Sequence, residues 1–216
     1  AWLRLSLSEG IGNDAARHLL ACFGSPQAVF EQTEAALRHV VTAGQAQALL
    51  AVPNELTVQY VRTLHWLQHS PDTHHHALWT LGDSHYPAAL LQLSDPPLMV
   101  YVAGQIEGHL GNAIAVVGSR NPTPQGAQTA TQFGEALANA GLCVVSGMAL
   151  GVDGAAHAGA LRGKPHTPSS TQWGTIAVVG TGLDRVYPRH HQSLAQEIAQ
   201  HGLIISEYHL GTPPLA

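Results

Sequence analysis

A single arginine stands at the end of an apolar run in the segment IAVVGSRNPTPQG, residues 114–126. Arg120 follows Gly118 and Ser119, where the apolar run stops and a loop with two prolines begins. Small residues at a strand end let backbone N–H groups come close to an anion, and an arginine there can form a forked, charge-assisted pair with a phosphate. The chemistry that this segment suggests is therefore anion binding at the tip of a strand.

A second segment, SGMALGVDG at residues 146–154, has the form of an anion-binding turn. Gly147 and Gly151 lead into an expected helix, whose positive dipole end would face a bound anion. A tight turn between a strand and a helix also needs glycine for steric reasons alone, so one such loop decides nothing. Three loops of this kind beside Arg120 and Arg185 favour the anion site over the steric explanation.

Familiar catalytic signatures are not found in the sequence. GTGLDR, at residues 180–185, lacks the third glycine of a dinucleotide fingerprint, and there is no P-loop lysine motif, no H-E-x-x-H and no convincing Ser-His-Asp order. We therefore assign no catalytic residue, no metal and no cofactor. Glu207, after the apolar run LIIS, is open to two interpretations, a general base or a carboxylate that orients an arginine.

Histidines raise the question of metal binding at two places. Asp153 and His157 are four residues apart, which puts both on one face of a helix. They could hold a metal, but a hydrogen-bonded structural pair is the interpretation that we prefer. The run from His74 to His76 could also bind a metal, but we prefer to interpret it as part of a solvated linker.

Charge is scarce in this chain. The 216 residues carry a formal net charge of -5 with 11% charged residues, which argues against a protein that grips duplex DNA over a broad positive surface. A local basic site stays open, because five of the nine lysines and arginines fall between residues 120 and 189: Arg120, Arg162, Lys164, Arg185 and Arg189.

The sequence gives several indications of the cellular setting. No apolar run is long enough to cross a membrane, and no signal peptide is evident at the start. The chain begins with Ala1 instead of methionine, which suggests trimming. Cys22 lies in a helical pattern and Cys143 in a strand pattern, so a reduced, cytoplasmic setting is the simplest expectation.

The two parts of the chain differ in their patterns. Residues 1–70 show apolar residues at helical spacing and no convincing strand, which predicts a small helical domain. From residue 113 onward, strand-like apolar runs alternate with helical ones, which predicts a parallel sheet covered on both faces. The expected fold is α/β, a doubly wound, Rossmann-like and mostly parallel sheet within residues 71–216, after the small all-α domain.

Ligands of such sheets bind beyond the carboxyl ends of the strands. Four loops should therefore converge on one edge of the sheet, and Arg120 should lie among them. The expected strands end at these groups of small or polar residues: Gly118 to Arg120, Ser146 and Gly147, Gly180 to Gly182, and Ser206 with Glu207.

The ordered set of motifs VGSRNPTPQG, SGMALGVDGAAHAGAL, TIAVVGTGLDRVYP and GLIISE resembles the DNA-processing protein A family, also called DprA or Smf. The resemblance covers roughly residues 80–210, and the helical start is similar to the family's N-terminal domain, a sterile-alpha-motif or helix-hairpin-helix module. Each motif is modest alone, but their order and spacing are specific. The resemblance implies a bacterial cytoplasmic protein of a family that is not known for enzymes.

The resemblance also implies a function in natural transformation, the uptake of DNA by competent cells. Such proteins bind incoming single-stranded DNA, protect it and help to load the RecA recombinase for DNA recombination. They typically form homodimers through the Rossmann domain, and many end in a winged-helix domain. The expected partners are therefore single-stranded DNA, RecA and a second copy of this chain, with no membrane partner.

The family's motifs can be placed on this sequence residue by residue. The G-S-R motif falls on residues 118–120, which makes Arg120 the phosphate-binding arginine. The S-G-x-A-x-G-[IV]-D motif falls on residues 146–153, and the G-x-D-x-x-Y-P motif on residues 182–188. The expected phosphate contacts are Gly118, Ser119, Arg120, Ser146, Gly147, Met148, Gly151, Arg185 and Arg189.

Two aromatic residues near these motifs, Tyr187 and Trp173, could stack against bases. Ordinary packing is the alternative for both, and we prefer it for Tyr187. The turn GIG at residues 10–12 could contact phosphates as a helix-hairpin-helix does. A turn that serves a small core is the preferred interpretation, since only Arg4 and Arg17 are nearby.

This sequence departs from the family at several places. Thr123 and Gln125 stand where Ser and Tyr are usual, and His191 replaces the usual Asn after the Y-P element. The segment 163–174 is longer than the usual turn. The chain stops at GTPPLA where the family continues, so we expect the C-terminal part of the sheet to be missing.

Two other classes of function stay open. One is a Rossmann enzyme that hydrolyses nucleoside monophosphates, with Arg120 and Glu207 at its site, although the sequence lacks the P-G-G-x-G-T loop of those enzymes. The other is an adaptor whose strand ends bind nothing and whose surface only recruits partners. Release of free base from nucleoside monophosphates would identify the first class.

Overall fold

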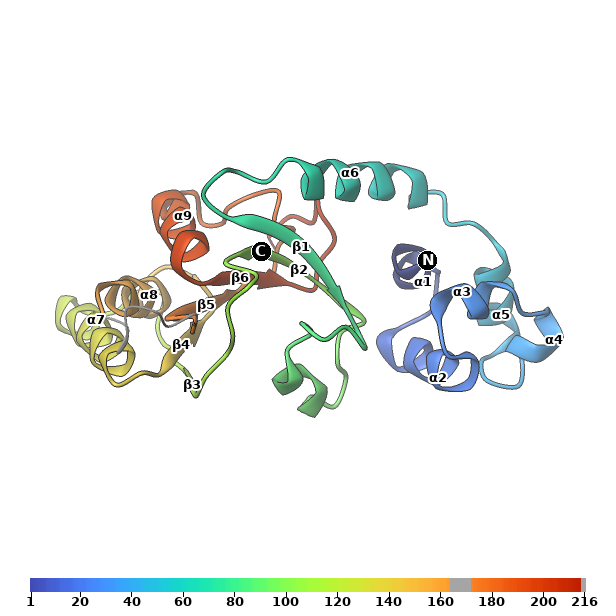
Figure 1. Ribbon diagram of the computed structural model, residues 1–216, viewed down its shortest axis with the longest axis horizontal. Helices are drawn as coiled ribbons and strands as arrows, with labels where there is room; N and C mark the ends of the chain where they lie inside the picture. Colours follow the sequence, from blue (N-terminus) through green and yellow to red (C-terminus); the bar gives the residue numbers. More distant parts are fainter. Residues whose placement is uncertain (164–171, 215–216) are drawn as a thin grey trace. The chain divides into compact units, whose positions relative to one another are not determined.

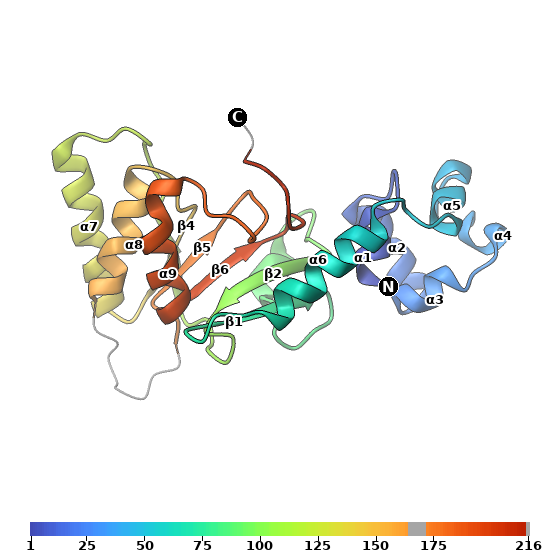
Figure 2. The same cartoon turned by 90° about the horizontal axis from the view of Figure 1, so that it is seen from above.

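The computed structural model describes residues 1–163 and 172–214 (Figure 1, and Figure 2 for the view from above). The chain forms two compact units, which we call the helical unit (residues 1–65 and 79–100) and the sheet unit (residues 66–78 and 101–216). Most of the long segment 163–174 lies outside the described residues. The domain boundary at residue 70 stays a prediction.

Short helices make up most of the helical unit. The side chains of Ser25, Thr33 and Thr42 cap the helices that follow them by accepting hydrogen bonds from backbone N–H groups. Gly24 ends the second helix with a φ of 85°, in the left-handed region that favours glycine. The helices of residues 1–70 are α1 (Trp2–Leu7), α2 (Asn13–Phe23), α3 (Pro26–Phe30), α4 (Glu34–Leu37), α5 (Ala43–Leu50) and α6 (Leu56–Gln68).

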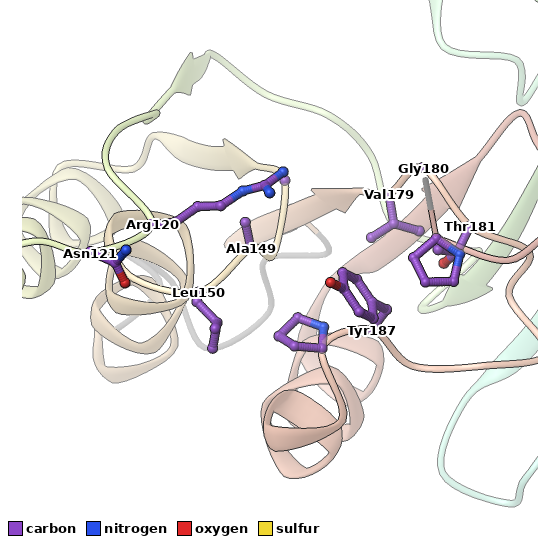
Figure 3. Close-up of a pocket in the computed structure, with 11 residues that line it drawn as sticks. Arg120, Asn121, Ala149, Leu150, Val179, Gly180, Thr181 and Tyr187 are labelled. Carbon is purple, nitrogen blue, oxygen red and sulfur yellow. The ribbon is translucent and has the colours of Figure 1, made fainter. Parts of the chain in front are cut away.

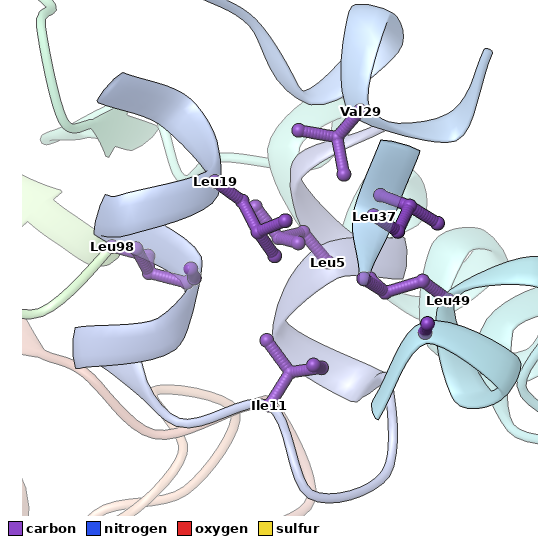
Figure 4. Close-up of a cluster of buried hydrophobic side chains, with 9 residues drawn as sticks. Leu5, Ile11, Leu19, Val29, Leu37, Leu49 and Leu98 are labelled. Carbon is purple, nitrogen blue, oxygen red and sulfur yellow. The ribbon is translucent and has the colours of Figure 1, made fainter. Parts of the chain in front are cut away.

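A cluster of buried apolar side chains holds the helical unit together (Figure 4). Leu5, Leu19 and Leu37 are fully buried in this cluster, and each such side chain contributes about 1.5–3 kcal/mol relative to an exposed one. Ile11, at the centre of the GIG turn, is buried in the same cluster. Its burial agrees with the interpretation of that turn as part of a small core.

The sheet has six strands in the order β1-β2-β6-β5-β4-β3. Neighbouring strands from β3 to β6 are parallel, with Val145 opposite Ile176 and Ala177 opposite Ile204, whereas β2 and β6 are antiparallel. The prediction of a mostly parallel α/β sheet is therefore confirmed. The strands are β1 (His75–Thr80), β2 (Met99–Gly104), β3 (Ala113–Ala115), β4 (Cys143–Ser146), β5 (Thr175–Val178) and β6 (Leu203–Ser206), and a short 3-10 helix, η1 (Ala88–Gln92), lies between β1 and β2.

The helices that connect the parallel strands form one layer, since α7 contacts α8 and α8 contacts α9 (Figures 1 and 2). Right-handed crossovers between strands that are adjacent in chain order place every helix on the same face. The described residues therefore do not show the expected helices on the second face, and the apolar side chains of Ile114, Val117 and Val178 are exposed. The helices are α7 (Pro124–Asn139), α8 (Val152–Arg162) and α9 (Gln192–His201), the last preceded by η2 (Arg189–His191).

Two glycines bring α7 and α8 into backbone contact. Gly134 on α7 lies against the carbonyl of Ala156, and Gly159 on α8 lies against the carbonyl of Thr131, with no room for a Cβ atom at either glycine. Behind this contact, Ala138, Val144, Ala156 and Ala160 are buried in one cluster. The close packing fixes α8, and with it the loop between β4 and α8, against α7.

Two further observations bear on the setting of the protein. Among the described residues, no helix combines the length and the apolar character needed to span a membrane. Both cysteines are free; Cys22 is exposed and Cys143 is buried in β4. Burial raises the pKa of the Cys143 thiol to about 12, so this thiol is unreactive at neutral pH.

Candidate nucleic-acid interface

The carboxyl ends of β3, β4 and β5 meet at a cavity of about 400 Å³ in the sheet unit (Figure 3). Arg120 lies on one side of this first cavity and Tyr187 on the other, with the loop after β4 between them. Three of the four loops that were predicted to converge line this cavity, whereas Ser206 and Glu207 do not. The cavity is lined by Arg120, Asn121, Gly147, Ala149, Leu150, Val179, Gly180, Thr181, Tyr187, Pro188 and Pro214.

Arg120 is exposed and has no hydrogen bond or ion pair with any described residue. An arginine side chain can donate five hydrogen bonds from a planar fork and stays charged at all physiological pH values. The guanidinium at the mouth of the cavity is therefore available to an external anion. Glu207 is exposed as well and forms no ion pair with any described arginine, so the second of its two interpretations, a carboxylate that orients an arginine, is not supported.

Arg120 owes its position to the close approach of two loops. Gly151 has a φ of 83°, and a Cβ atom there would collide with the carbonyl oxygens of Ser119 and Arg120. The backbone N–H of Val152, at the start of α8, donates a hydrogen bond of 3.1 Å to the Ser119 carbonyl. The Ser119 hydroxyl accepts a bond of 3.0 Å from the N–H of Asn121, which tightens the turn that carries the arginine.

The loop from residue 146 to residue 151 is held from three sides. Ser146 donates its hydroxyl to the Val116 carbonyl at 2.6 Å, and the Asp153 carboxylate accepts from the Ala149 N–H at 3.3 Å. Met148 has a φ of 58°, unusual for a residue other than glycine, and its side chain is buried. His191 Nδ1 donates to the Met148 carbonyl at 2.9 Å and so stabilises this conformation.

These hydrogen bonds divide the predicted phosphate contacts of the loop into residues that line the cavity and residues that hold the loop in place. Gly147 lines the cavity, whereas the Ser146 hydroxyl and the Met148 side chain are turned into the protein and position the loop. The N–H groups of Leu150 and Gly151 donate to no described residue, so they are open to an anion next to Arg120. Backbone donors of this kind bind phosphate oxygens at the start of a helix.

The two aromatic candidates have different surroundings. Tyr187 is 51% exposed on the wall of the first cavity, so its ring is not buried in a core, and its stacking against a base stays a prediction. Trp173 is 7% exposed, and its indole Nε1 donates to the Gln105 carbonyl at 2.7 Å. Too little of the Trp173 ring is accessible for a base to stack on it, and we do not retain it in the site.

Arg185 and Arg189 do not line the first cavity, although the sequence predicted them as phosphate contacts of the same site. They line a second cavity of the sheet unit, together with Trp66 and His76. Between them in the chain, Tyr187 and Pro188 line the first cavity. The segment 183–189 therefore presents alternate parts of its sequence to two different cavities.

The buried histidine of α8 is structural. His157 is fully buried, and its Nδ1 donates to the Thr175 hydroxyl at 2.7 Å, which in turn donates to the Val144 carbonyl at 2.8 Å. Burial lowers the pKa of His157 to about 4, even though the nearby Asp153 carboxylate acts in the opposite direction.

The predicted hydrogen-bonded pair of Asp153 and His157 is wrong, because each bonds elsewhere. The described residues contain no group of three or more ligands that could hold a metal. His75 and His76 belong to β1 and not to a linker.

Sequence reasoning missed several residues of the cavity wall. Asn121 directly follows Arg120, and its side-chain amide could have been recognised as a further polar contact. Leu150, Val179 and Pro188 give no such signal, because an apolar residue in a loop looks the same whether it lines a cavity or packs inside. The sequence predicted that Thr181 lies at a strand end. In the structure Thr181 is buried and lines the cavity.

The strand-end cavity of this α/β fold has an arginine and backbone N–H groups without a partner among the described residues, a geometry that suits an anion. A model of the family "DNA recombination-mediator protein A" matches residues 77–216. The chain belongs to this family, and the predicted resemblance is confirmed.

Two curated relatives carry names of the same family. The chain is 35% identical to Protein Smf of Escherichia coli (strain K12). This similarity covers 100% of the chain and 53% of the relative. It is 38% identical to DNA processing protein DprA of Streptococcus pneumoniae over 63% of the chain and 45% of the relative. The chain thus spans about half the length of these curated relatives.

Two solved structures are similar to that of this chain. The X-ray structure of DprA from Streptococcus pneumoniae matches 99% of the chain and 68% of that protein with a TM-score of 0.71 and 28% identity. DNA processing protein A from Helicobacter pylori, described for its unique single-stranded DNA binding mode, matches 65% of the chain and 59% of that protein, with a TM-score of 0.52 and 32% identity.

Proposed function

We propose that the protein binds the backbone of single-stranded DNA in the first cavity. The observation that carries this proposal is the unpaired Arg120 beside the open N–H groups of Leu150 and Gly151. The guanidinium forms a forked pair with one phosphate, and the N–H groups take an oxygen of the same or the next phosphate. The similarity to the Helicobacter pylori protein, which binds single-stranded DNA, supports DNA as the source of the phosphates.

Tyr187 adds an interaction that duplex DNA cannot use. Its exposed ring forms the opposite wall of the cavity from Arg120, where an unstacked base can lie against it. Stacking of one base on an aromatic ring contributes about 1–3 kcal/mol and tolerates any base. Phosphate contacts carry no sequence information, so binding is nonspecific in sequence and selective for single strands.

The wider function follows the family. The protein acts in natural transformation, where it protects incoming single-stranded DNA and helps to load RecA recombinase onto it. It works in the cytoplasm as a homodimer and by binding, not as an enzyme. The support for these statements is the family membership of residues 77–216 and the names of the relatives.

A finer feature of the architecture belongs to the same proposal. Residues 1–70 form a sterile-alpha-motif or helix-hairpin-helix-like domain, for which the short helices α1 to α5 and the GIG turn give support.

The test is a mobility-shift titration with single-stranded and duplex oligonucleotides at several salt concentrations. Replacing Arg120 by alanine removes a charged hydrogen-bonding group, so single-strand affinity should fall about 10- to 100-fold. The slope of log K against log salt should become shallower by about 0.7 for each phosphate released.

Arg162→Ala is the matched control, because Arg162 is also exposed in the sheet unit and lines neither cavity. If Arg120→Ala binds single strands as tightly as the unmodified protein, the assignment of Arg120 is wrong. Equal affinity for duplex and single strands would overturn the single-strand selectivity. Release of free base from nucleoside monophosphates would overturn the statement that the protein acts by binding alone.

A further inference from the structure

His191 lies outside the first cavity but bonds to two segments that line it. Its backbone N–H donates to the Pro188 carbonyl at 2.9 Å, and its imidazole Nδ1 donates to the Met148 carbonyl at 2.9 Å. A carbonyl oxygen can only accept, so the proton of the second bond is on Nδ1. Pro188 lines the cavity on the side of Tyr187, and the loop that contains Met148 lines it between Tyr187 and Arg120 (Figure 3). One residue therefore holds the two segments at a fixed separation.

The backbone of Met148 depends on this bond more than an ordinary loop residue would. Its φ of 58° lies in the left-handed region, which residues other than glycine adopt only where the surrounding structure holds them. Its side chain is buried, so the residue is anchored on that side as well. The Met148 carbonyl belongs to the peptide bond that leads to Ala149. Its orientation therefore sets the course of the chain toward the N–H groups of Leu150 and Gly151.

Gly154, in the first turn of α8, leaves space for the imidazole of His191. A Cβ atom at this glycine would lie 2.5 Å from Cε1 and 2.9 Å from Nε2 of the ring. The backbone of Gly154 is helical, and alanine generally stabilises a helix relative to glycine. The helix itself therefore does not require a glycine at this position, whereas the ring of His191 does.

We propose that His191 is a positioning residue for the phosphate that Arg120 binds: its imidazole fixes the loop from residue 146 to residue 151 so that the N–H groups of Leu150 and Gly151 face that phosphate. The proposal rests on the proposed function of the first cavity, and it adds a residue that touches no ligand. The donors that His191 positions are neutral. Its contribution to affinity is therefore one of geometry and not of charge.

The first test changes the donor at position 191. His191→Leu removes it, whereas His191→Asn keeps one, because the amide Nδ2 of asparagine is as many bonds from Cα as Nδ1 of histidine. Single-strand affinity should fall about fivefold to tenfold in His191→Leu, and it should stay close to that of the unmodified chain in His191→Asn. His190→Leu is the matched control, since His190 is exposed and lines neither cavity. An equal loss in His191→Asn and His191→Leu would overturn the role of the hydrogen bond.

The salt dependence of binding separates a loss of positioning from a loss of charge. In His191→Leu the slope of log K against log salt should stay unchanged, because the arginines still neutralise the same number of phosphates. In Arg120→Ala the slope should become shallower by about 0.7 for each phosphate released. A shallower slope in His191→Leu would mean that the imidazole binds phosphate as a cation, and it would overturn the positioning role.

A second variant reaches the same loop without a change at His191. In Gly154→Ala the new methyl group displaces the ring, so single-strand affinity should fall as it does in His191→Leu. Asparagine has no atoms in the place of Cε1 and Nε2, so the double variant Gly154→Ala/His191→Asn should bind normally. Gly44→Ala on α5, where a Cβ atom meets no other atom within 4 Å, is the control. An equal loss in Gly154→Ala and in the double variant would overturn the explanation through the ring.

A measurement without DNA separates this proposal from the one on which it rests. The three-bond coupling between the N–H and Hα protons of Met148, measured by NMR, depends on φ. It should change in His191→Leu and in Gly154→Ala, and it should keep its value in His191→Asn. Either an unchanged coupling or an unchanged affinity in His191→Leu would overturn the positioning role. A changed coupling in His191→Leu, together with unchanged DNA binding in Arg120→Ala, would overturn the proposed function of the first cavity alone.

Discussion

Two arginines of the helical unit, Arg4 and Arg17, differ from two of the sheet unit, Arg120 and Arg189, in what they touch. Arg4 donates to the carbonyls of Leu49 and Ala51 at 2.8 and 3.3 Å and lies 3.9 Å over the ring of Phe30. Arg17 donates to the Asp95 carboxylate at 2.7 Å and to the Pro96 carbonyl at 3.0 Å. In the sheet unit, by contrast, Arg120 and Arg189 have no partner among the described residues.

Arg4 and Arg17 are therefore structural cations. Arg120 is available to a ligand because it has no partner among the described residues and also lines the first cavity, whereas Arg38 and Arg162, equally without such a partner, do not line it. A guanidinium that already bonds to carbonyl and carboxylate oxygens has few donors left for a ligand. A net charge of -5 argued against nucleic acid, but the relevant quantity is the number of unpaired guanidinium groups at the strand ends. Binding in this protein should therefore depend on the sheet unit, and Arg4 and Arg17 should affect stability alone.

The largest effect on stability is expected for Arg4→Ala. The substitution removes two hydrogen bonds from a charged donor and a cation–π contact, so the free energy of unfolding should fall by about 2–3 kcal/mol. Urea denaturation measures this loss, and Arg120→Ala should show none of it. Weaker DNA binding by Arg4→Ala, at a temperature where it stays folded, would mean that the helical unit contributes to the interface.

A second test uses pH, because His157 in the sheet unit is buried and neutral while His18 in the helical unit is exposed beside Asp14. The pKa of His157 is lowered from 6.5 to about 4, so the unfolded chain takes up a proton at a higher pH than the folded one. The free energy of unfolding should fall by about 2 kcal/mol between pH 7 and pH 5.

Burial also lowers the pKa values of His74 and His76, which adds to the acid sensitivity in the same direction. The control is His157→Gln. Because this variant has no imidazole to protonate at position 157, its free energy of unfolding should fall less between pH 7 and pH 5. Denaturation curves at both pH values give the measurement. A stability that does not change over this range would contradict the neutral, buried state of His157.

The smallest effect is expected for Arg17→Ala. Its carboxylate partners are well exposed, with side-chain exposures of 74% for Asp14 and 59% for Asp95, and exposed ion pairs contribute less than about 1 kcal/mol. The midpoint of urea denaturation should shift slightly, and single-strand affinity should stay the same. A tenfold loss of affinity would place Arg17 in the interface and end the contrast between the two units.

Much of the sheet unit could be predicted because its strands are continuous apolar runs that end in glycine or serine. The same pattern placed Arg120 after a strand at the edge of the sheet, although that strand, β3 (Ala113–Ala115), is shorter than the apolar run and exposed. The positions of Arg185 and Arg189 could not be predicted in this way. In an irregular loop the direction of each side chain depends on the local backbone, and no periodicity in the sequence records it.

The helical layer shows a similar limit. Alternating strands and helices indicate parallel crossovers, but the face that each helix covers depends on the order of the strands in the sheet. Here the order β3-β4-β5-β6 follows the chain, which places α7, α8 and α9 together on one face. Trp173 was also misjudged, because only tertiary structure shows that its indole bonds to the Gln105 carbonyl.

The contact between α7 and α8 has a consequence for how this protein can change over time. At Gly134 and Gly159 the largest side chain that fits is a hydrogen atom, since backbone carbonyls of the opposite helix occupy the space. A random library selected only for folded protein should return glycine at both positions, while it accepts many residues at the exposed Phe133. The two glycines should therefore be kept even in a descendant that no longer binds DNA. Their presence in a related sequence would indicate the same helix packing, and it would say nothing about the ligand.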